Sequence, residues 1–190
     1  MRRICTALLL SGFCSFCSYA APILQLMPAG GVLSGTPGSA VGWGYTLTNT
    51  ADFLVVTGAS FTPSSLYGSF QDYISAFNFI VVGPSPESPS VSQAFNPGTH
   101  GGVGAFTVSS TAPSGIAITG HIVLNYSLFS QDPNAPNFDP GASLLVADAT
   151  ISAPAVVNIV PEPATFLLIA GPLLLAVALR RAKITGFEAT

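Results

Sequence analysis

The sequence predicts a mainly β fold: a single antiparallel β-sandwich of immunoglobulin-like or jelly-roll type, flanked by an N-terminal signal peptide and a C-terminal hydrophobic helix. Three observations support this prediction. Through residues 21–159, apolar and polar residues alternate with period two, glycine and proline separate the alternating runs, and no run has a convincing helical repeat. Strands without crossover helices between them pair in antiparallel fashion, which favours a sandwich.

The clearest alternation lies in residues 41–48. The run after it, residues 53–61, is rich in β-branched and aromatic side chains, and residues 49–52 between the two runs have turn-forming chemistry. We therefore predict a β-hairpin here. One face of its first strand is apolar and carries Val41, Trp43, Tyr45 and Leu47.

The longest alternation covers residues 116–128, with one face in the core, the other mostly in water, and Gly120 as a natural place for a bulge or bend. Residues 64–76 are compatible with a short helical turn or two, and residues 84–89 form a proline-rich extended loop. Residues 152–159 are either the last strand or the start of a tether. The weaker strand candidates are residues 23–27, 77–82, 103–109, 144–151 and 155–159.

The N-terminus has the three parts of a secretory signal peptide. Arg2 and Arg3 precede an apolar stretch, residues 4–16, and small residues stand where a signal peptidase cleaves. We predict a signal peptide over residues 1–20, with cleavage between Ala20 and Ala21. A lipoprotein anchored through a cysteine of this segment is the alternative, although phenylalanine precedes the candidate cysteines where a small residue is expected.

Charge is distributed very unevenly along the chain. All five lysine and arginine residues and all three cysteines lie in the two ends of the chain. Residues 21–159 contain six carboxylates and no lysine or arginine, which gives this part a formal charge of −6 with histidine neutral. Electrostatics therefore exclude nucleic acid, anionic lipid and phosphorylated substrates as favoured partners. A disulfide framework is excluded too, and stability must come from burial in one core. The six acids are Asp52, Asp72, Glu87, Asp132, Asp139 and Asp148.

The C-terminus places a polar motif, an apolar run and a basic end in sequence. The apolar run, residues 164–179, is sixteen residues long and makes about 24 Å of helix, which spans a ~30 Å hydrocarbon core only marginally. The basic end should stay on the cytoplasmic side, with the body outside. The motif is Val160, Pro161, Glu162 and Pro163, and the basic stop is Arg180, Arg181 and Lys183.

This arrangement resembles the PEP-CTERM sorting signal of Gram-negative exported proteins, over residues 160–190, about one-sixth of the chain. The resemblance implies the general secretion machinery, signal peptidase and an exosortase-type membrane protease as partners. It also implies membrane attachment through the helix before processing, and then a place in the cell envelope or extracellular matrix of a bacterium that makes exopolysaccharide. An ordinary C-terminal anchor is the alternative. Bodies in this family are diverse, so no biochemical activity transfers to residues 21–159.

The body lacks the sequence patterns of common catalytic sites. It has no Gly-x-Ser-x-Gly elbow, no His-Glu-x-x-His pair, no phosphate loop with its lysine and no cysteine. His100 and His121 are isolated, and for each we expect an ordinary surface or hydrogen-bonded histidine. We therefore predict a non-catalytic protein. An exported enzyme ranks last among the possibilities, because it would need two of the aspartates brought together as acid and base.

One candidate metal site lies in residues 132–139, where four oxygen-bearing side chains occur within eight residues. Extracellular calcium favours such hard ligands. The segment lacks the glycine and the bidentate glutamate of an EF-hand loop, and simple turn chemistry explains the same residues. The candidate ligands are Asp132, Asn134, Asn137 and Asp139.

Three aromatic residues, Trp43, Tyr45 and Tyr126, are candidates for a platform on which a polysaccharide stacks. Their periodicity also places them on core faces, which favours a packing role. Carbohydrate or calcium binding by a surface module is thus the alternative function. Exposed aromatic side chains would favour it over a purely structural role.

Overall fold

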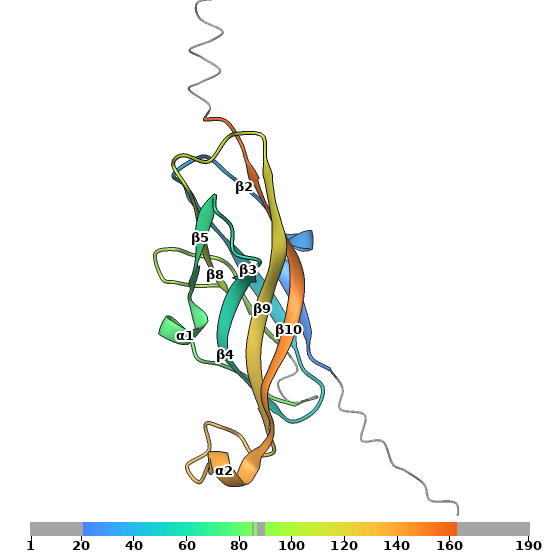
Figure 1. Ribbon diagram of the computed structural model, residues 1–190. Coiled ribbons are helices and arrows are strands. Elements are labelled where there is room, and N and C mark those ends of the chain that lie inside the picture. Colours follow the sequence, from blue (N-terminus) through green and yellow to red (C-terminus); the bar gives the residue numbers. More distant parts are fainter. Residues whose placement is uncertain (1–20, 85, 87–89, 163–190) are drawn as a thin grey trace, which may run out of the picture.

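The computed structural model describes residues 21–84, 86 and 90–162, which form the elongated β-structure in Figure 1. The predicted signal peptide (residues 1–20), Pro163, the apolar helix (164–179) and the basic stop lie outside the described residues. Within the described ranges, no helix has the length and apolar character needed to cross a membrane.

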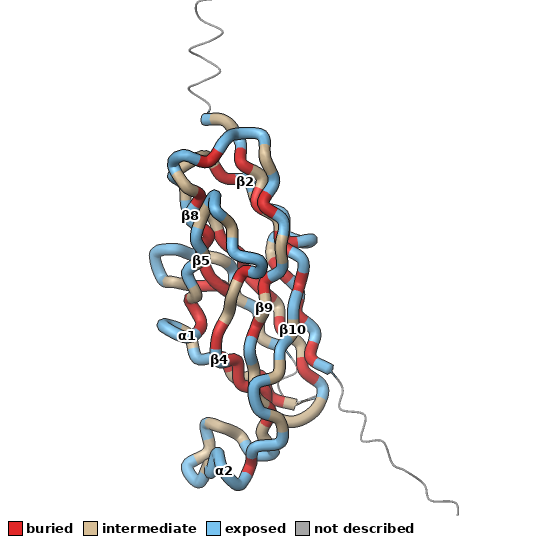
Figure 2. The backbone as a smooth tube through the Cα atoms, in the orientation of Figure 1, coloured by how far each residue is buried: buried red, intermediate tan, exposed pale blue. Residues whose placement is uncertain are grey.

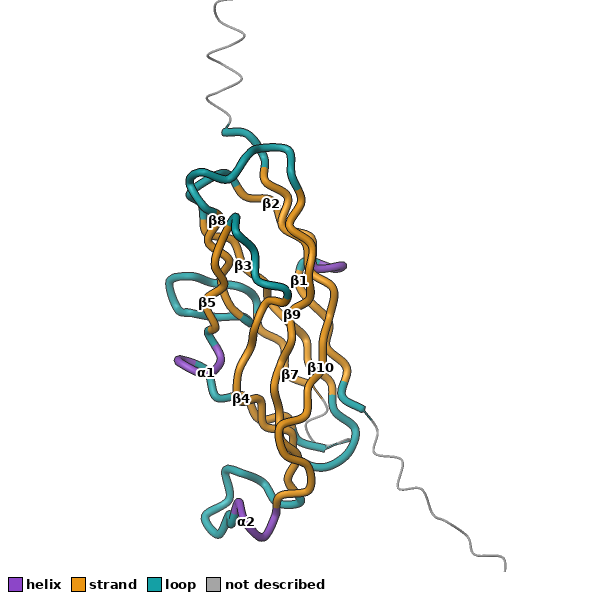
Figure 3. The backbone as a smooth tube through the Cα atoms, in the orientation of Figure 1, coloured by secondary structure: helices purple, strands orange, loops and turns teal. Residues whose placement is uncertain are grey.

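Strands dominate the described part of the chain, and the helical turns lie at its periphery (Figure 3). The helical turns are η1 (Ala29–Gly31), α1 (Ile74–Phe77) and α2 (Pro140–Ser143). The strands are β1 (Ile23–Met27), β2 (Val32–Gly35), β3 (Ala40–Thr48), β4 (Phe53–Thr62), β5 (Gly68–Asp72), β6 (Ile80–Val82), β7 (Ser90–Gln93), β8 (Gly104–Val108), β9 (Ala117–Phe129) and β10 (Leu144–Ile159).

The strands form two five-stranded sheets. The first has the order β1-β3-β8-β5, with β7 also paired to β3, and the second has the order β2-β10-β9-β4-β6. One pairing corrects the prediction of a purely antiparallel sandwich, because β10 runs parallel to β2. The direction of β2 is not set by a hairpin, since the strand before it, β1, belongs to the other sheet.

The predicted hairpin over residues 41–61 is wrong, because its two strands lie in different sheets. From β1 to β7 the chain changes sheet at every connection, so β3 pairs with β1, β7 and β8 while β4 pairs with β6 and β9. The connection crosses from one sheet to the other, and Asp52 adopts a φ of 59° within it. The buried amide of Asn49 holds the turn by donating to the Asp52 carbonyl at 2.8 Å.

The core lies between the two sheets and contains side chains from both. Buried positions accordingly alternate with exposed ones along strands of each sheet (Figure 2). Trp43 of β3 stacks on Phe61 of β4 with ring centroids 5.8 Å apart, and Phe61 meets Phe106 of β8 edge-on at 5.3 Å. As the period-two pattern predicted, alternate residues of β9 point into this core and include Ile122 and Leu124, both fully buried. Burial of these side chains is the main stabilising term for a body without disulfides.

Gly120 does not introduce a bulge in β9 as predicted, because the pairing of β9 with β10 continues across it without a shift, while the pairing with β4 ends next to it at His121. A side chain there would instead collide with the ring of Phe61, 2.7 Å from the Cβ position. The register shift lies on the partner strand, between Val56 and Gly58 of β4. Residues 144–159 form one strand rather than two, which answers whether residues 152–159 are strand or tether.

Candidate binding surface

A long loop leaves the first sheet between β7 and β8. These two strands follow one another along the same edge of β3, where Tyr45 pairs with Gln93 and Trp43 with Gly104. Between these two pairs β3 has a single residue, Gly44, whereas the segment from β7 to β8 has ten, and these residues, 94–103, project from the sheet as the loop beside α1 in Figure 1.

This loop and α1 bring four rings into contact on the outside of the sandwich, and Phe79 lines the same clefts as Phe77; we name these five residues the aromatic surface. The four rings stack in two perpendicular pairs. The rings of Phe77 and His100 are stacked, with centroids 4.0 Å apart and an interplanar angle of 13°, and those of Tyr73 and Phe95 are stacked at 6.2 Å and 8°. The Tyr73 ring meets the His100 ring edge-on, with centroids 5.0 Å apart and an interplanar angle of 83°. The members are Tyr73, Phe77, Phe79, Phe95 and His100.

A glycine in β3 makes the position of Phe95 possible. A Cβ on Gly42 would overlap the Phe95 ring, so only a residue without a side chain lets the loop lie flat on the outer face of β3. The same contact buries Gly42, which faces away from the core. The outer face of β3 has glycine at positions 42 and 44, and the loop that contains Phe95 packs against the surface that these glycines leave open.

Hydrogen bonds hold both halves of the aromatic surface in place. The side-chain amide of Asn78 donates to the His100 carbonyl at 2.6 Å and to the Tyr73 carbonyl at 3.3 Å, which ties the loop to α1. The Asn96 carboxamide oxygen accepts from the Gly98 amide at 2.9 Å and closes the turn of the loop. The surface is therefore built by specific contacts between two segments.

Asp72 fixes the start of α1 and joins the two sheets. One carboxylate oxygen accepts from the amide of Ile74 at 2.7 Å, and the other accepts from the amide of Ala59 on β4 at 3.0 Å. Because β5 ends at Asp72, this single side chain connects the first sheet, the second sheet and α1.

Two members of the aromatic surface are open to solvent, Phe77 with 51 % and Phe79 with 70 % of its surface exposed. A cleft lies on each side of this pair, one of about 430 Å³ and one of about 380 Å³, and both share residues 77–79. The first cleft also includes Ser92 and Gln93. The rings thus form a ridge between two hollows with polar groups in their walls.

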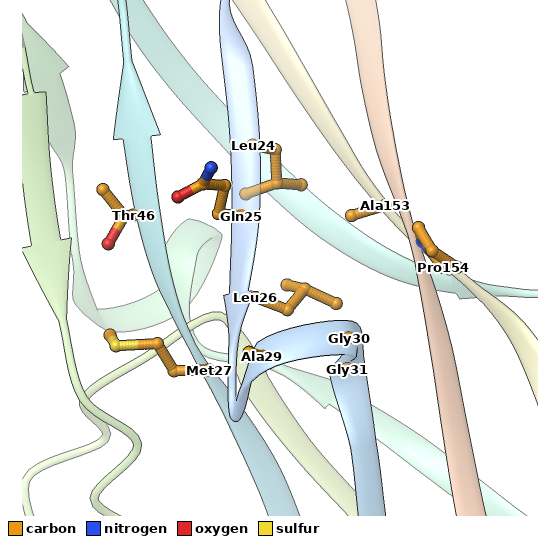
Figure 4. A pocket seen from close by; sticks show the side chains of 10 residues that line it. All are labelled: Leu24, Gln25, Leu26, Met27, Ala29, Gly30, Gly31, Thr46, Ala153 and Pro154. Carbon is orange, nitrogen blue, oxygen red and sulfur yellow. The ribbon is translucent and has the colours of Figure 1, made fainter.

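A further cleft of about 440 Å³ lies at one open edge of the sandwich, between β1 and β10 (Figure 4). Leu24 and Leu26 point from β1 toward Ala153 and Pro154, whereas the Gln25 side chain lies on the other side of β1. Its wall combines the core residues Leu24, Leu26 and Ala153 with the turn of residues 29–31 and with the polar side chains of Gln25 and Thr46.

The candidate stacking platform at Trp43, Tyr45 and Tyr126 is wrong, and the alternative that their periodicity favoured, packing in the core, agrees with their burial. Trp43 has no exposed surface and Tyr45 is buried, while Tyr126 is half-buried beside the core. These side chains follow the core alternation of their strands, so packing is their role. Burial also raises the pKa of Tyr45 to about 12, because the ionised phenolate would lose its hydration.

The candidate calcium ligands lie in the connection between β9 and β10, and the calcium hypothesis stays a prediction. Asp132 accepts from the amide of Asn134 at 2.9 Å, and Asp139 caps α2 by accepting from two backbone amides. Both carboxylates thus already serve the local turns, as the turn interpretation predicted, and Asn137 is exposed nearby. Among the described residues, no group of three His, Cys, Asp or Glu side chains is placed to hold a metal ion.

The first three residues of the predicted sorting motif, residues 160–162, follow directly after the last strand. β10 ends at Ile159, the amide of Val160 still donates to the Gly35 carbonyl at 3.0 Å, and Glu162 is exposed. His121 is exposed on β9, and His100 packs within the aromatic surface. Through the described ranges, no side-chain hydrogen bond links either histidine ring to a carboxylate.

Comparisons with known proteins add little. No protein-family model matches the chain, and no curated protein sequence matches it. A chain in the crystal structure of the CaDoc0917–CaCohA2 complex at pH 5.5 is similar at 17 % identity over 73 % of this chain and 99 % of that chain, with a TM-score of 0.24. A structural likeness this weak carries no argument about fold or partner.

Proposed function

We propose that this chain is an exported, non-catalytic protein of the cell envelope or extracellular matrix, which its C-terminal signal sorts and an exosortase-type protease processes. One observation carries the proposal: the folded body ends at Ile159, immediately before the motif of residues 160–163. A protease can therefore bind the chain around the exposed Glu162 without unfolding a strand. The signal sequence, the acidic body and the basic end support the same topology.

Two side chains of the types that acid–base chemistry uses make structural contacts. Asp72, which lines a further cleft, accepts hydrogen bonds from the backbone amides of Ala59 and Ile74. His100 is stacked on Phe77, and His121 stands on the outer face of the second sheet. These arrangements favour a binding or structural role over acid–base chemistry.

Processing in cells tests the proposal. An antiserum against the body would follow the size and location of the protein in bacteria with and without an exosortase-type protease, for the natural chain and for Glu162→Ala. In cells that have the protease, we expect a shorter product for the natural chain and no shortening for Glu162→Ala; in cells without the protease, we expect no shortening of either. Asp148→Asn, which changes another exposed carboxylate, is the matched control and should be processed normally. Equal size and location in both strains would overturn the sorting proposal.

Carbohydrate binding is the second candidate function, and the exposed rings of Phe77 and Phe79 favour it. Aromatic side chains open to solvent beside clefts are the feature that separates a binding module from a purely structural sandwich. The two candidates are compatible, since a sorted envelope protein can also bind its surroundings.

A further inference from the structure

We propose that the aromatic surface binds a neutral polysaccharide, with Phe77 and Phe79 as the stacking platform. The inference deepens the second candidate function by giving it a site and a ligand class, and it does not depend on sorting. It rests on ring geometry, on the polar groups in the two clefts, on charge and on the rigidity of the site.

The rings offer apolar faces to a flat ligand. His100 stacks on the Phe77 ring at a centroid distance of 4.0 Å, yet Phe77 stays 51 % exposed, which leaves part of its apolar surface open to a ligand. Phe79 is two residues further along the chain, within about 7 Å of backbone. Sugar rings present C–H groups to aromatic faces, and neighbouring units of one polymer can contact both rings.

The flanking clefts supply hydrogen-bonding groups. Ser92 and Gln93 line one cleft, and Thr57 and Ser75 line the other. The Gln93 side-chain oxygen accepts from the backbone at 3.0 Å, which leaves its amide N–H groups as donors. Apolar rings between hydroxyl and amide groups match the alternating C–H and O–H surface of a sugar chain.

Charge decides between a neutral polymer and an anionic one. From residue 21 to residue 162 the chain has no lysine or arginine, so it offers none of the permanently charged side chains that usually pair with a uronic acid, a sulfate or a lipid phosphate. The carboxylates of the body repel such groups. An anionic membrane is disfavoured for the same reason, because surface binding to it relies on basic side chains.

The site is already arranged for binding. Asn78 ties the loop to α1 through two carbonyls, and Asp72 fixes the first turn of α1. Little conformational entropy is then lost when a ligand lies on the rings, which raises affinity.

Isothermal titration of the full chain tests the proposal. The chain would be purified in a polyoxyethylene detergent, whose head group contains no sugar, and titrated with cellohexaose, mannohexaose, maltohexaose and, as an anionic comparison, polygalacturonate. We expect at least one neutral hexaose to bind, and polygalacturonate to bind more weakly or not at all. Phe79→Ala should weaken binding about tenfold or more through loss of one stacked ring.

Leu66→Ala is the matched control, because Leu66 is 96 % exposed and lies outside the site. It should bind like the natural chain. Phe77→Ala should also weaken binding of the neutral hexaose. Thermal melts verify that each variant is folded. The proposal is overturned if no neutral hexaose binds, if Phe79→Ala binds as tightly as the natural chain, if polygalacturonate binds best, or if the ridge instead mediates self-association that Phe79→Ala abolishes. Each result is independent of processing in cells.

Discussion

The indole N–H of Trp43 donates a buried hydrogen bond of 2.8 Å to the carbonyl of Gly31, and this bond ties β3 of the first sheet to the turn that leads into β2 of the second. Trp43→Phe removes the donor, leaves a buried carbonyl without a partner and opens a small cavity. We expect a loss of about 2–4 kcal/mol in the free energy of unfolding.

Urea denaturation followed by far-ultraviolet circular dichroism measures this loss, since the variant lacks the single tryptophan of the chain. Leu66→Ala serves as the control and should stay within about 0.5 kcal/mol of the natural chain. A Trp43→Phe variant as stable as the natural protein would mean that the bond does not tie the sheets together.

Asp72 links both sheets and α1 through its two carboxylate oxygens. Asp72→Asn keeps one acceptor and replaces the other with a donor that faces backbone N–H groups, so we expect a loss of about 1–2 kcal/mol. Asp148→Asn removes the same charge at an exposed position with φ of 52°, which asparagine tolerates, and should be nearly neutral. Equal midpoints in urea for the two variants would contradict this role of Asp72.

The strongly alternating strands could be predicted from the sequence because their burial pattern is local. β1 has the predicted bounds, and β3, β4 and β9 lie within one residue of theirs at each end. β2, β5 and β7 were missed, because short strands with glycine and serine lack an apolar alternation. The pairing partner of a strand depends on segments that are distant in the sequence. Residues 49–52 therefore have the composition of a hairpin turn and yet connect two sheets.

The aromatic surface could not be predicted for a similar reason. Phe77 and Phe79 fell within a segment predicted to be a strand, and His100 was expected to be only an ordinary surface or hydrogen-bonded histidine. The two segments meet because the pairing of β7 and β8 on β3 forces residues 94–103 outward, and Gly42 then lets Phe95 lie on the sheet. The only sequence signal was Gly42 and Gly44 on the outer face of a strand, where missing side chains imply a close neighbour.

Tyr45 should make the stability of the body depend on pH in alkaline solution. Its pKa is about 12 in the folded protein, against about 10 for a tyrosine in the unfolded chain. Below pH ~10 the phenol is protonated in both states, and its contribution is fully present. Between pH ~10 and ~12 the unfolded chain loses this proton first, so folding becomes less favourable as pH rises.

Melting temperatures from pH 8 to 12 test this. We expect the melting temperature of Tyr45→Phe to fall less steeply than that of the natural chain between about pH 10 and 12. Tyr67→Phe, which changes an exposed tyrosine, should show the same fall in melting temperature as the natural chain. A decline that is the same in the natural chain and in Tyr45→Phe would assign the alkaline loss to other groups.

Trypsin should distinguish the precursor from the processed protein, because the chain has no lysine or arginine between Ala21 and Leu179. Once the signal peptide is removed, the precursor keeps three basic residues, Arg180, Arg181 and Lys183, and trypsin should shorten it at this end. If processing cuts anywhere before Arg180, the mature protein offers trypsin no site, even after heat denaturation removes protection by the fold. Chymotrypsin, which cuts after aromatic residues, should digest both denatured forms and so shows that the chain is accessible. We expect protein from cells with an exosortase-type protease to keep its mass under trypsin and protein from cells without it to lose its tail; trypsin-sensitive protein in both would contradict removal of the basic end.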